Sequence, residues 1–280
     1  LRSAGFTHVR DMTGSLAQWK MLRDLDLNGE LPLYTEMNFV AEDFKDFHRA
    51  LAEAKEARNL KSNRMRVSGI KIFSDGALGS EGAYLSQSYR NSSNRGLFLW
   101  DLDDFSEIVK ATWKENLVMS IHAIGDQAIH EIAVVFEKLA QQNIRGKIAI
   151  EHAQIVRKET IQILSKLVSS GQDVTCHMQP CHFLADRVWL REKISDLYFS
   201  AFPWQALQKA GIRIQWGSDA PIAKPSVSCN LQALRDSAVE GIPAINGDPW
   251  GPHSHPDMNW GGECLTEIDP DFSSIFQSSI

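Results

Sequence analysis

The feature that most constrains the fold is an alternation repeated along the chain, in which a short β-branched run precedes a longer stretch of helical periodicity. The predicted strands are residues 6–10, 31–40, 67–73, 117–122, 147–152, 173–179 and 212–217. The predicted helices are residues 15–27, 42–59, 102–116, 126–143, 158–170, 195–210 and 226–240. Strands alternating with helices indicate a parallel sheet with right-handed crossovers, hence an α/β fold that is either a doubly wound open sheet or a (β/α)8 barrel.

The barrel interpretation requires eight strand–helix units, and seven are found. Residues 1–5 resemble the end of a helix leading into the first strand, so the missing unit is expected to be the first. With 280 residues, 43% of them hydrophobic, the chain can build one large barrel core. We expect a barrel domain over residues 1–245, containing strands 2 to 8, followed by a loop-rich acidic segment over residues 246–280.

The charge distribution excludes several classes of partner. The formal net charge is −6, from 35 acidic and 29 basic residues, and no Lys or Arg follows Arg235. Nucleic-acid binding requires a clustered basic excess, which is absent. No run approaches eighteen apolar residues, so no membrane span is expected. A small-molecule substrate fits this composition, and a homodimer stays open.

The cysteines and the first residues carry little functional information. Cys176, Cys181, Cys229 and Cys264 form no CxxC pair and are too sparse for a disulfide scaffold, so we interpret them as ordinary buried thiols. The chain starts with Leu1 and has no apolar signal-peptide core in residues 1–10. We therefore interpret it as a piece of a longer chain and assign no compartment.

Polar side chains fall at or near the ends of five predicted strands. They are Lys71, His122, His152, His177 and Asp219. In a parallel α/β barrel the carboxyl ends of the strands form the rim that carries active sites. Histidine nitrogens and aspartate oxygens from separate strands are donors that zinc or a similar divalent ion accepts. A single strand-end histidine is more often only hydrogen-bonded, and a lone Lys71 would ordinarily extend to solvent. Lys71 nevertheless lies between Ile70 and Ile72, where burial lowers the pKa of an amine.

Several motifs in one register resemble a known family. They are GIKIFSDGALGS, SIHAIGDQAI, IEHAQIV, HMQPCHF and FPWQALQKAGIRIQWGSDAPI, and the opening GFTHVRDMTG resembles that family's second barrel strand. Together they resemble the amidohydrolase superfamily, within it the family-3 metal-dependent hydrolases that include N-substituted formamide deformylases. The resemblance implies a (β/α)8 barrel with one or two divalent metal ions, usually zinc.

The resemblance also implies roles for individual residues. Lys71 matches the lysine that is carboxylated and bridges metals, and His122 and His152 match metal ligands of the next two strands. Asp219 matches the aspartate that binds metal and moves the proton of the attacking water, with helix capping before Pro221 as the alternative. The implied reaction is hydrolysis of a C–N bond in an amide, formamide or cyclic amide.

Four further residues are candidates for substrate binding. Asp75, in the DGALGS turn, could contact a ligand, although an ordinary turn is almost as good an explanation. His177, Gln179 and His182 follow the seventh barrel strand and could hydrogen-bond substrate or an oxyanion, or else only order the loop.

The chain departs from the family pattern in two ways, and the first of them favours a different function. The family's first strand supplies a His-x-His pair, whereas the one such pair here, His253 and His255, follows Asp219. The family's flanking β-sandwich is also not found. The alternative is therefore a non-catalytic regulatory or binding protein that retains the barrel. An open-sheet protein binding an anion is a weaker third reading, because no GxGxxG or Walker loop is present.

Overall fold

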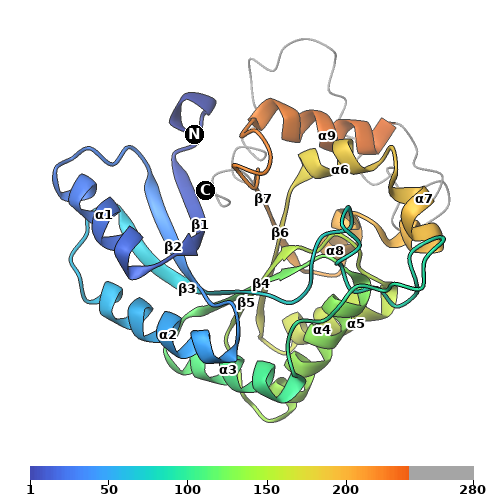
Figure 1. The fold of residues 1–280 in the computed structure, drawn as a ribbon, viewed down its shortest axis with the longest axis horizontal. Helices are drawn as coiled ribbons and strands as arrows, with labels where there is room; N and C mark the ends of the chain where they lie inside the picture. Colours follow the sequence, from blue (N-terminus) through green and yellow to red (C-terminus); the bar gives the residue numbers. More distant parts are fainter. Residues whose placement is uncertain (240–280) are drawn as a thin grey trace.

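The computed structural model describes residues 1–239, with side chains through Leu234. Its strands form one parallel sheet in which every strand pairs with its sequence neighbours, in the order β1 to β7. The bounds are β1 His8–Gly14, β2 Tyr34–Val40, β3 Met65–Phe73, β4 Val118–Ala123, β5 Lys147–His152, β6 Asp173–Met178 and β7 Arg213–Trp216. The sheet curls strongly (Figure 1). This is a (β/α)8 barrel fold with seven of its strands among residues 1–239, so the expectation of an incomplete barrel is confirmed.

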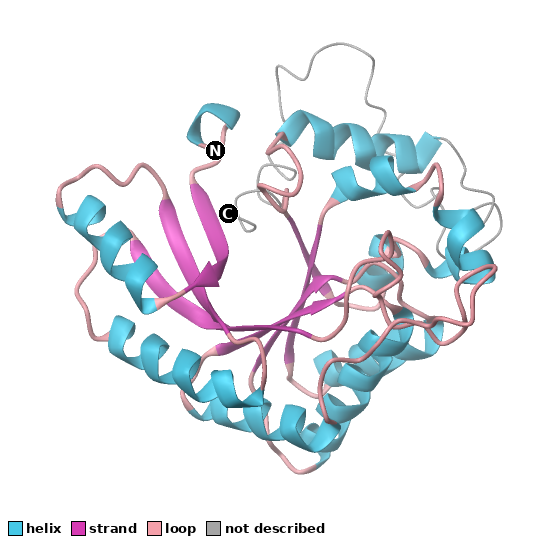
Figure 2. Ribbon diagram, viewed as in Figure 1, coloured by secondary structure: helices cyan, strands magenta, loops and turns pink. Residues whose placement is uncertain are grey.

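Helices lie outside the curved sheet, as Figure 2 shows. The crossover helices are α1 Leu16–Leu27, α2 Phe44–Arg58, α3 Leu102–Lys114, α4 Asp126–Gln141 and α5 Lys158–Ser169. The later helices are α6 Pro180–Asp186, α7 Leu190–Ile194, α8 Trp204–Lys209 and α9 Val227–Val239, with 3₁₀ turns η1 Arg2–Ala4 and η2 Ser195–Ser200. None of the helices within the described range is long and apolar enough to cross a bilayer.

Alternation along each strand separates an apolar face from a polar one. In β4, Met119 and Ile121 are completely buried in the hydrophobic core, while Ser120 and His122 belong to the opposite face. The curl of the sheet directs that second face into the barrel interior. The barrel interior therefore carries the hydroxyls, amides and charges, and the helix-facing side carries the core.

Strand register brings the polar strand ends to one level of the barrel. Phe73 of β3 is paired with His122 of β4, which is paired with Glu151 of β5. Glu151 is paired in turn with His177 of β6. Because paired residues of parallel strands point to the same face, these side chains lie at one level of the barrel interior, near the carboxyl ends of the strands.

The structure differs from the sequence prediction in the segment after β6. Helices α6 and α7 replace what the sequence indicated as loop, and the single helix expected over 195–210 is divided into η2 and α8. Pro203 lies directly before α8 and provides the physical reason, since proline has no N–H to donate inside a helix.

Two local features involve the start of α4 and the cysteines. Gly125 is the N-cap of α4 and Asp126 is its first helical residue, with a completely buried carboxylate whose Oδ2 lies 2.9 Å from Arg157 Nε. Cys181 and Cys229 form a disulfide instead of being separate thiols, whereas Cys176 is a buried free cysteine. The predicted segment 246–280 lies outside the described residues.

Candidate metal centre

His122 and His152 meet at the rim from neighbouring strands. His122 is near the end of β4 and His152 is the last residue of β5, and their ring centroids are 4.5 Å apart. His122 Nε2 lies 3.7 Å from Asp75 Oδ1 and 3.4 Å from the Gly76 carbonyl oxygen. The structure thus brings together the two imidazoles that the sequence indicated as metal ligands.

Burial keeps both imidazoles uncharged. It lowers the pKa of His122 to about 3, and the nearby Lys71 ammonium lowers it further in the same direction. Burial also holds the pKa of His152 well below its usual value, with His122 and Lys71 as further causes. A neutral imidazole has a free nitrogen lone pair, which is the form that binds metal ions.

The orientation of His152 is set by Gln179, the residue that follows β6. Gln179 Nε2 donates to the His177 carbonyl oxygen at 3.2 Å, which leaves Oε1 facing His152 Nδ1 at 2.9 Å. An amide oxygen only accepts, so Nδ1 of His152 carries the proton and Nε2 presents its lone pair. A hydrogen bond of this kind on the second ring nitrogen is typical of metal-ligating histidines.

His152 belongs to a three-residue cluster with His182 and Asp219. One potential ligand atom from each residue lies within 4.8 Å of the other two. His182, on the short helix α6, has its Nε2 at 3.8 Å from Asp219 Oδ2. This Nε2 is buried and has no hydrogen-bond partner among the described residues. A buried nitrogen without a partner, facing a carboxylate and a second imidazole, fits a divalent cation as the missing partner.

Asp219 reaches the cluster through a tight turn after β7. Its backbone has a φ of 56°, in the left-handed region, and its carbonyl oxygen accepts from the Ile222 N–H at 2.8 Å. The carboxylate is partly exposed, and partial burial raises its pKa while Lys71 opposes that shift. The Asp219 carboxylate faces His182 and belongs to the cluster with His152 and His182.

Lys71 lies inside the barrel rather than at its surface. Only 3% of the residue is exposed, and its Nζ donates to the Ile72 carbonyl oxygen at 3.0 Å. The ammonium also lies 3.6 Å from the centroid of the Phe73 ring. Burial lowers the pKa of Lys71 to about 8, with Glu151 and Asp219 opposing the shift. A fraction of the amine is therefore neutral near pH 8 and open to carbamate formation.

Asp75 links the loop after β3 to the loop after β4. Its carboxylate accepts three backbone N–H bonds, from Tyr84 at 2.9 Å, Ile124 at 3.1 Å and Gly125 at 2.8 Å. Burial nevertheless raises the pKa of Asp75 to about 7. Asp75 therefore ties together the two loops that flank His122, which is a candidate metal ligand.

His177 lies apart from the three-residue cluster. It is buried in the register row between Glu151 and Gln215. Burial lowers its pKa to about 3, and Glu151 opposes that shift. The three candidates of the HMQPCH motif therefore separate: Gln179 orients His152, His182 joins the cluster, and His177 belongs to the barrel interior.

Sequence reasoning missed two charged residues of the barrel interior. Arg10 of β1 and Glu151 of β5 form a buried ion pair, with Arg10 Nη2 at 3.0 Å from Glu151 Oε1. Burial raises the pKa of Glu151, but Arg10 and other neighbouring charges hold it at about 2. The available signal was that each is a charged residue within a predicted strand.

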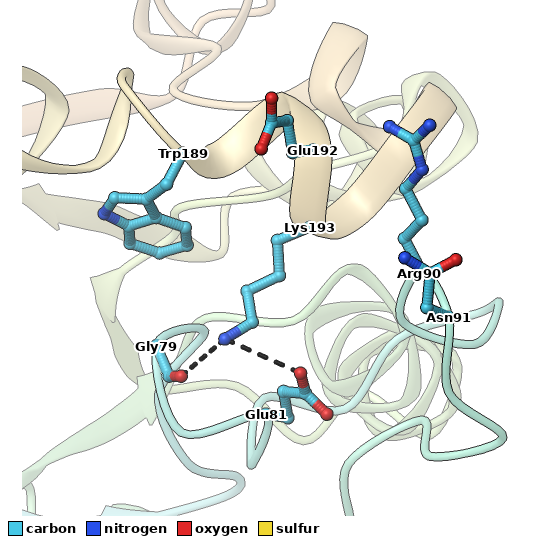
Figure 3. Close-up of a pocket in the computed structure, with 7 residues that line it drawn as sticks. All are labelled: Gly79, Glu81, Arg90, Asn91, Trp189, Glu192 and Lys193. Carbon is cyan, nitrogen blue, oxygen red and sulfur yellow. Dashed lines mark hydrogen bonds and ion pairs between the residues drawn. The ribbon is translucent and has the colours of Figure 1, made fainter.

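A cavity of about 770 Å³ involves the loop that follows β3 (Figure 3). It opens between α7 and the loop after β3 and is lined by Gly79, Glu81, Arg90, Asn91, Trp189, Glu192 and Lys193. Lys193 Nζ donates to the Gly79 carbonyl oxygen at 2.6 Å and lies 3.6 Å from Glu81. The cavity contains none of the candidate metal ligands.

Comparison with known proteins identifies relatives of this chain. It is 29% identical over 198 residues to the putative amidohydrolase YtcJ of Bacillus subtilis, covering 69% of this chain and 36% of that protein. It is 29% identical over 196 residues to the protein LONG AFTER FAR-RED 3 of Arabidopsis thaliana, covering 68% of this chain and 32% of that protein. The chain thus spans about a third of the length of these relatives.

The fold is similar to that of a solved hydrolase. An uncharacterized metal-dependent hydrolase from Pyrococcus furiosus superposes with a TM-score of 0.66 at 23% identity, covering 82% of this chain and 45% of that chain. The model of the amidohydrolase family matches residues 1–234, nearly the whole described range. The chain therefore belongs to the amidohydrolase family.

Proposed function

We propose that this chain is part of a metal-dependent hydrolase that cleaves a C–N bond in an amide, formamide or cyclic amide. The observation that carries the proposal is the cluster of His152, His182 and Asp219, with the unpartnered buried nitrogen of His182. Membership of the amidohydrolase family supports it. So does the similarity of the fold to that of the metal-dependent hydrolase from Pyrococcus furiosus.

The donor set suits zinc or a similar ion. His152, His182 and Asp219 would hold one ion, and His122, whose ring is 4.5 Å from that of His152, would bind beside them. Lys71 is the candidate for a carboxylated lysine, because its amine is buried and its pKa lies at about 8. A carbamate on Lys71 would supply the anionic oxygens that a second divalent ion requires.

A bound divalent ion supplies a Lewis acid that polarises a carbonyl and lowers the pKa of water from 15.7 to about 7. Asp219 is the proposed proton carrier, accepting a proton from the attacking water and delivering it to the leaving amine. Burial raises the pKa of Asp219, but a cation held at His152 and His182 would lower it and keep the carboxylate ionised.

The remaining candidates would support binding. Gln179 holds His152 in the required tautomer, and Asp75 fixes the two loops that flank His122. His177, buried in the barrel interior, stays a candidate for a hydrogen bond to the substrate. Which amide is cleaved would depend on the rim loops, including those that border the Lys193 cavity.

Metal analysis tests the proposal directly. Zinc content would be measured by atomic spectrometry for the wild type and for His152→Ala and His182→Ala. The matched control is His130→Ala on α4, which removes an imidazole hydrogen-bonded to Thr160 at 3.0 Å. We expect near-stoichiometric zinc in the wild type and control, and loss of zinc in the other two variants.

Activity forms the second arm of this test. Chelator-sensitive hydrolysis of N-formyl, N-acyl and cyclic amides is expected in the wild type, and replacement of Asp219 by Asn should abolish it. Lys71→Arg cannot form a carbamate and should lose the second ion only. Zinc bound equally well after His152 and His182 are both replaced would refute the ligand assignment.

A further inference from the structure

The buried Arg10–Glu151 pair crosses the barrel beneath the candidate metal centre. Arg10 Nη2 donates to Glu151 Oε1 at 3.0 Å and Arg10 Nη1 donates to Oε2 at 3.4 Å, so both carboxylate oxygens are engaged. The side chains are only 13% and 7% exposed. A two-point contact of a guanidinium with a carboxylate fixes orientation as well as distance.

Polar side chains from the strands between them extend this pair into a network. Arg10 Nη2 also donates to Ser120 Oγ at 3.4 Å, and Ser120 Oγ donates to Asn38 Oδ1 at 3.0 Å. Asn38 Nδ2 in turn donates to the Asp11 carbonyl oxygen at 3.2 Å. One chain of contacts therefore connects β1, β2, β4 and β5 inside the barrel.

Glu151 immediately precedes His152, and the backbone there is unusual. Consecutive residues of a regular strand point to opposite faces, yet Glu151 contacts Arg10 in the interior and His152 contacts His122 and Gln179 at the rim. The left-handed φ values of His152, 75°, and Ala153, 45°, account for this by turning the chain out of the strand. Such a conformation in a residue other than glycine persists only where its surroundings hold it.

Contacts on both sides of His152 hold this turn. On the carboxyl side, Ala153 N donates to the Ala123 carbonyl oxygen at 3.1 Å. On the amino side, the Glu151 side chain is held by Arg10. The backbone of Glu151 is paired with His122 and His177 in the sheet, and the ion pair adds a side-chain restraint on the same residue, so its loss would loosen the turn on that side.

We propose that Arg10 and Glu151 are positioning residues for His152: their ion pair fixes the left-handed turn that directs the His152 imidazole to the metal centre. This inference rests on the proposed function, in which His152 is a metal ligand. Neither Arg10 nor Glu151 touches the ion or the substrate in this account. Their effect is transmitted through one peptide unit.

The test is the zinc affinity of the 280-residue chain, measured by competition with a chelating dye, for Arg10→Met and Glu151→Gln. We expect binding about 10- to 100-fold weaker than in the wild type, the range found when groups that orient metal ligands are removed. The matched control is the ion pair of Asp126 and Arg157, in which Arg157 Nε lies 2.9 Å from Asp126 Oδ2. This pair is also largely buried, but it lies in the helical layer and not inside the barrel. Arg157→Met and Asp126→Asn should lower stability without weakening zinc binding.

Two additional measurements keep the inference testable if a variant folds poorly. Arg10→Lys retains the charge and loses the two-point contact, so it should fold and show an intermediate loss of affinity. Visible absorption of the cobalt-loaded proteins reports ligand geometry, and it should change in Arg10→Lys and Glu151→Gln but not in Asp126→Asn.

The possible outcomes separate this inference from the proposed function. If His152→Ala loses zinc while Arg10→Met and Glu151→Gln bind it with wild-type affinity and spectrum, the positioning role is wrong and the metal centre stands. If His152→Ala binds zinc as the wild type does, the metal centre is wrong and this inference falls with it.

Discussion

The two faces of the curved sheet contrast sharply. The helix-facing side carries completely buried apolar residues such as Phe39, Ile72 and Ile121. At neighbouring positions the interior carries groups such as Lys71 and Glu151, where barrels of this class ordinarily hold bulky branched side chains. Buried charge contributes little net stability, whereas apolar packing contributes most of it. The outer face therefore stabilises the fold, and the interior collects the buried polar and charged side chains.

The largest expected effect is on the outer face. Phe39 is completely buried, with its ring centroid 6.5 Å from that of Trp19 on α1. Phe39→Ala should lower the free energy of unfolding by about 3–5 kcal/mol, measured by urea denaturation, because it leaves a cavity. Zinc affinity of the folded protein should not change. If Phe39→Ala instead lost much zinc affinity and little stability, the outer face and the interior would not have the separate roles described above.

Bound zinc should stabilise the folded protein only if the cluster of His152, His182 and Asp219 is intact. At a free zinc concentration about 100 times its dissociation constant, a ligand that binds only the folded state adds about 2.7 kcal/mol. Thermal unfolding with zinc and with excess chelator measures this difference. In His182→Ala the two conditions should coincide, while Phe39→Ala should retain the full difference.

Acid should destabilise the interior through His177. Burial lowers the pKa of His177 from its ordinary value of 6.5 to about 3 in the folded protein, so between these values the unfolded chain binds a proton that the folded chain does not. The free energy of unfolding should therefore fall as pH drops below 6.5, by about 1.4 kcal/mol per pH unit for this residue. Comparing urea denaturation at pH 6 and pH 5, His177→Gln should reduce the slope by that amount. An unchanged slope would show that His177 titrates normally.

The smallest effect is expected on the exposed surface. Lys20 and Glu56 form an ion pair at 2.9 Å between α1 and α2, with both side chains more than half exposed. Lys20→Met should change the free energy of unfolding by about 0.5 kcal/mol or less. A larger effect in the same denaturation assay would indicate that exposed charges contribute substantially to stability, in addition to the apolar packing of the outer face.

Local pattern was sufficient to predict the strands and the crossover helices. The runs ending at Phe73 and His152 show strand periodicity and finish where the structure ends β3 and β5. The helix predicted from residue 102 begins there as α3, and Asp101 directly before it accepts from Asp103 N at 2.8 Å. Each of these features depends on neighbours within a few residues.

Contacts between distant residues could not be predicted in the same way. Arg10 and Glu151 are separated by 141 positions, and the partner of a charged strand residue depends on how the sheet curls. Cys181 and Cys229 are 48 residues apart with no spacing pattern that pairs them. His182 joins His152 and Asp219 only because α6 forms directly after β6, and helices of seven residues give a weak periodic signal.

The strict β1-to-β7 order of the sheet has a consequence for synthesis on the ribosome. Each strand needs only the strand made just before it, so a growing chain can add one unit at a time without waiting for a distant partner. The ion pair between the first and fifth strands would then form late, after the intervening units have assembled.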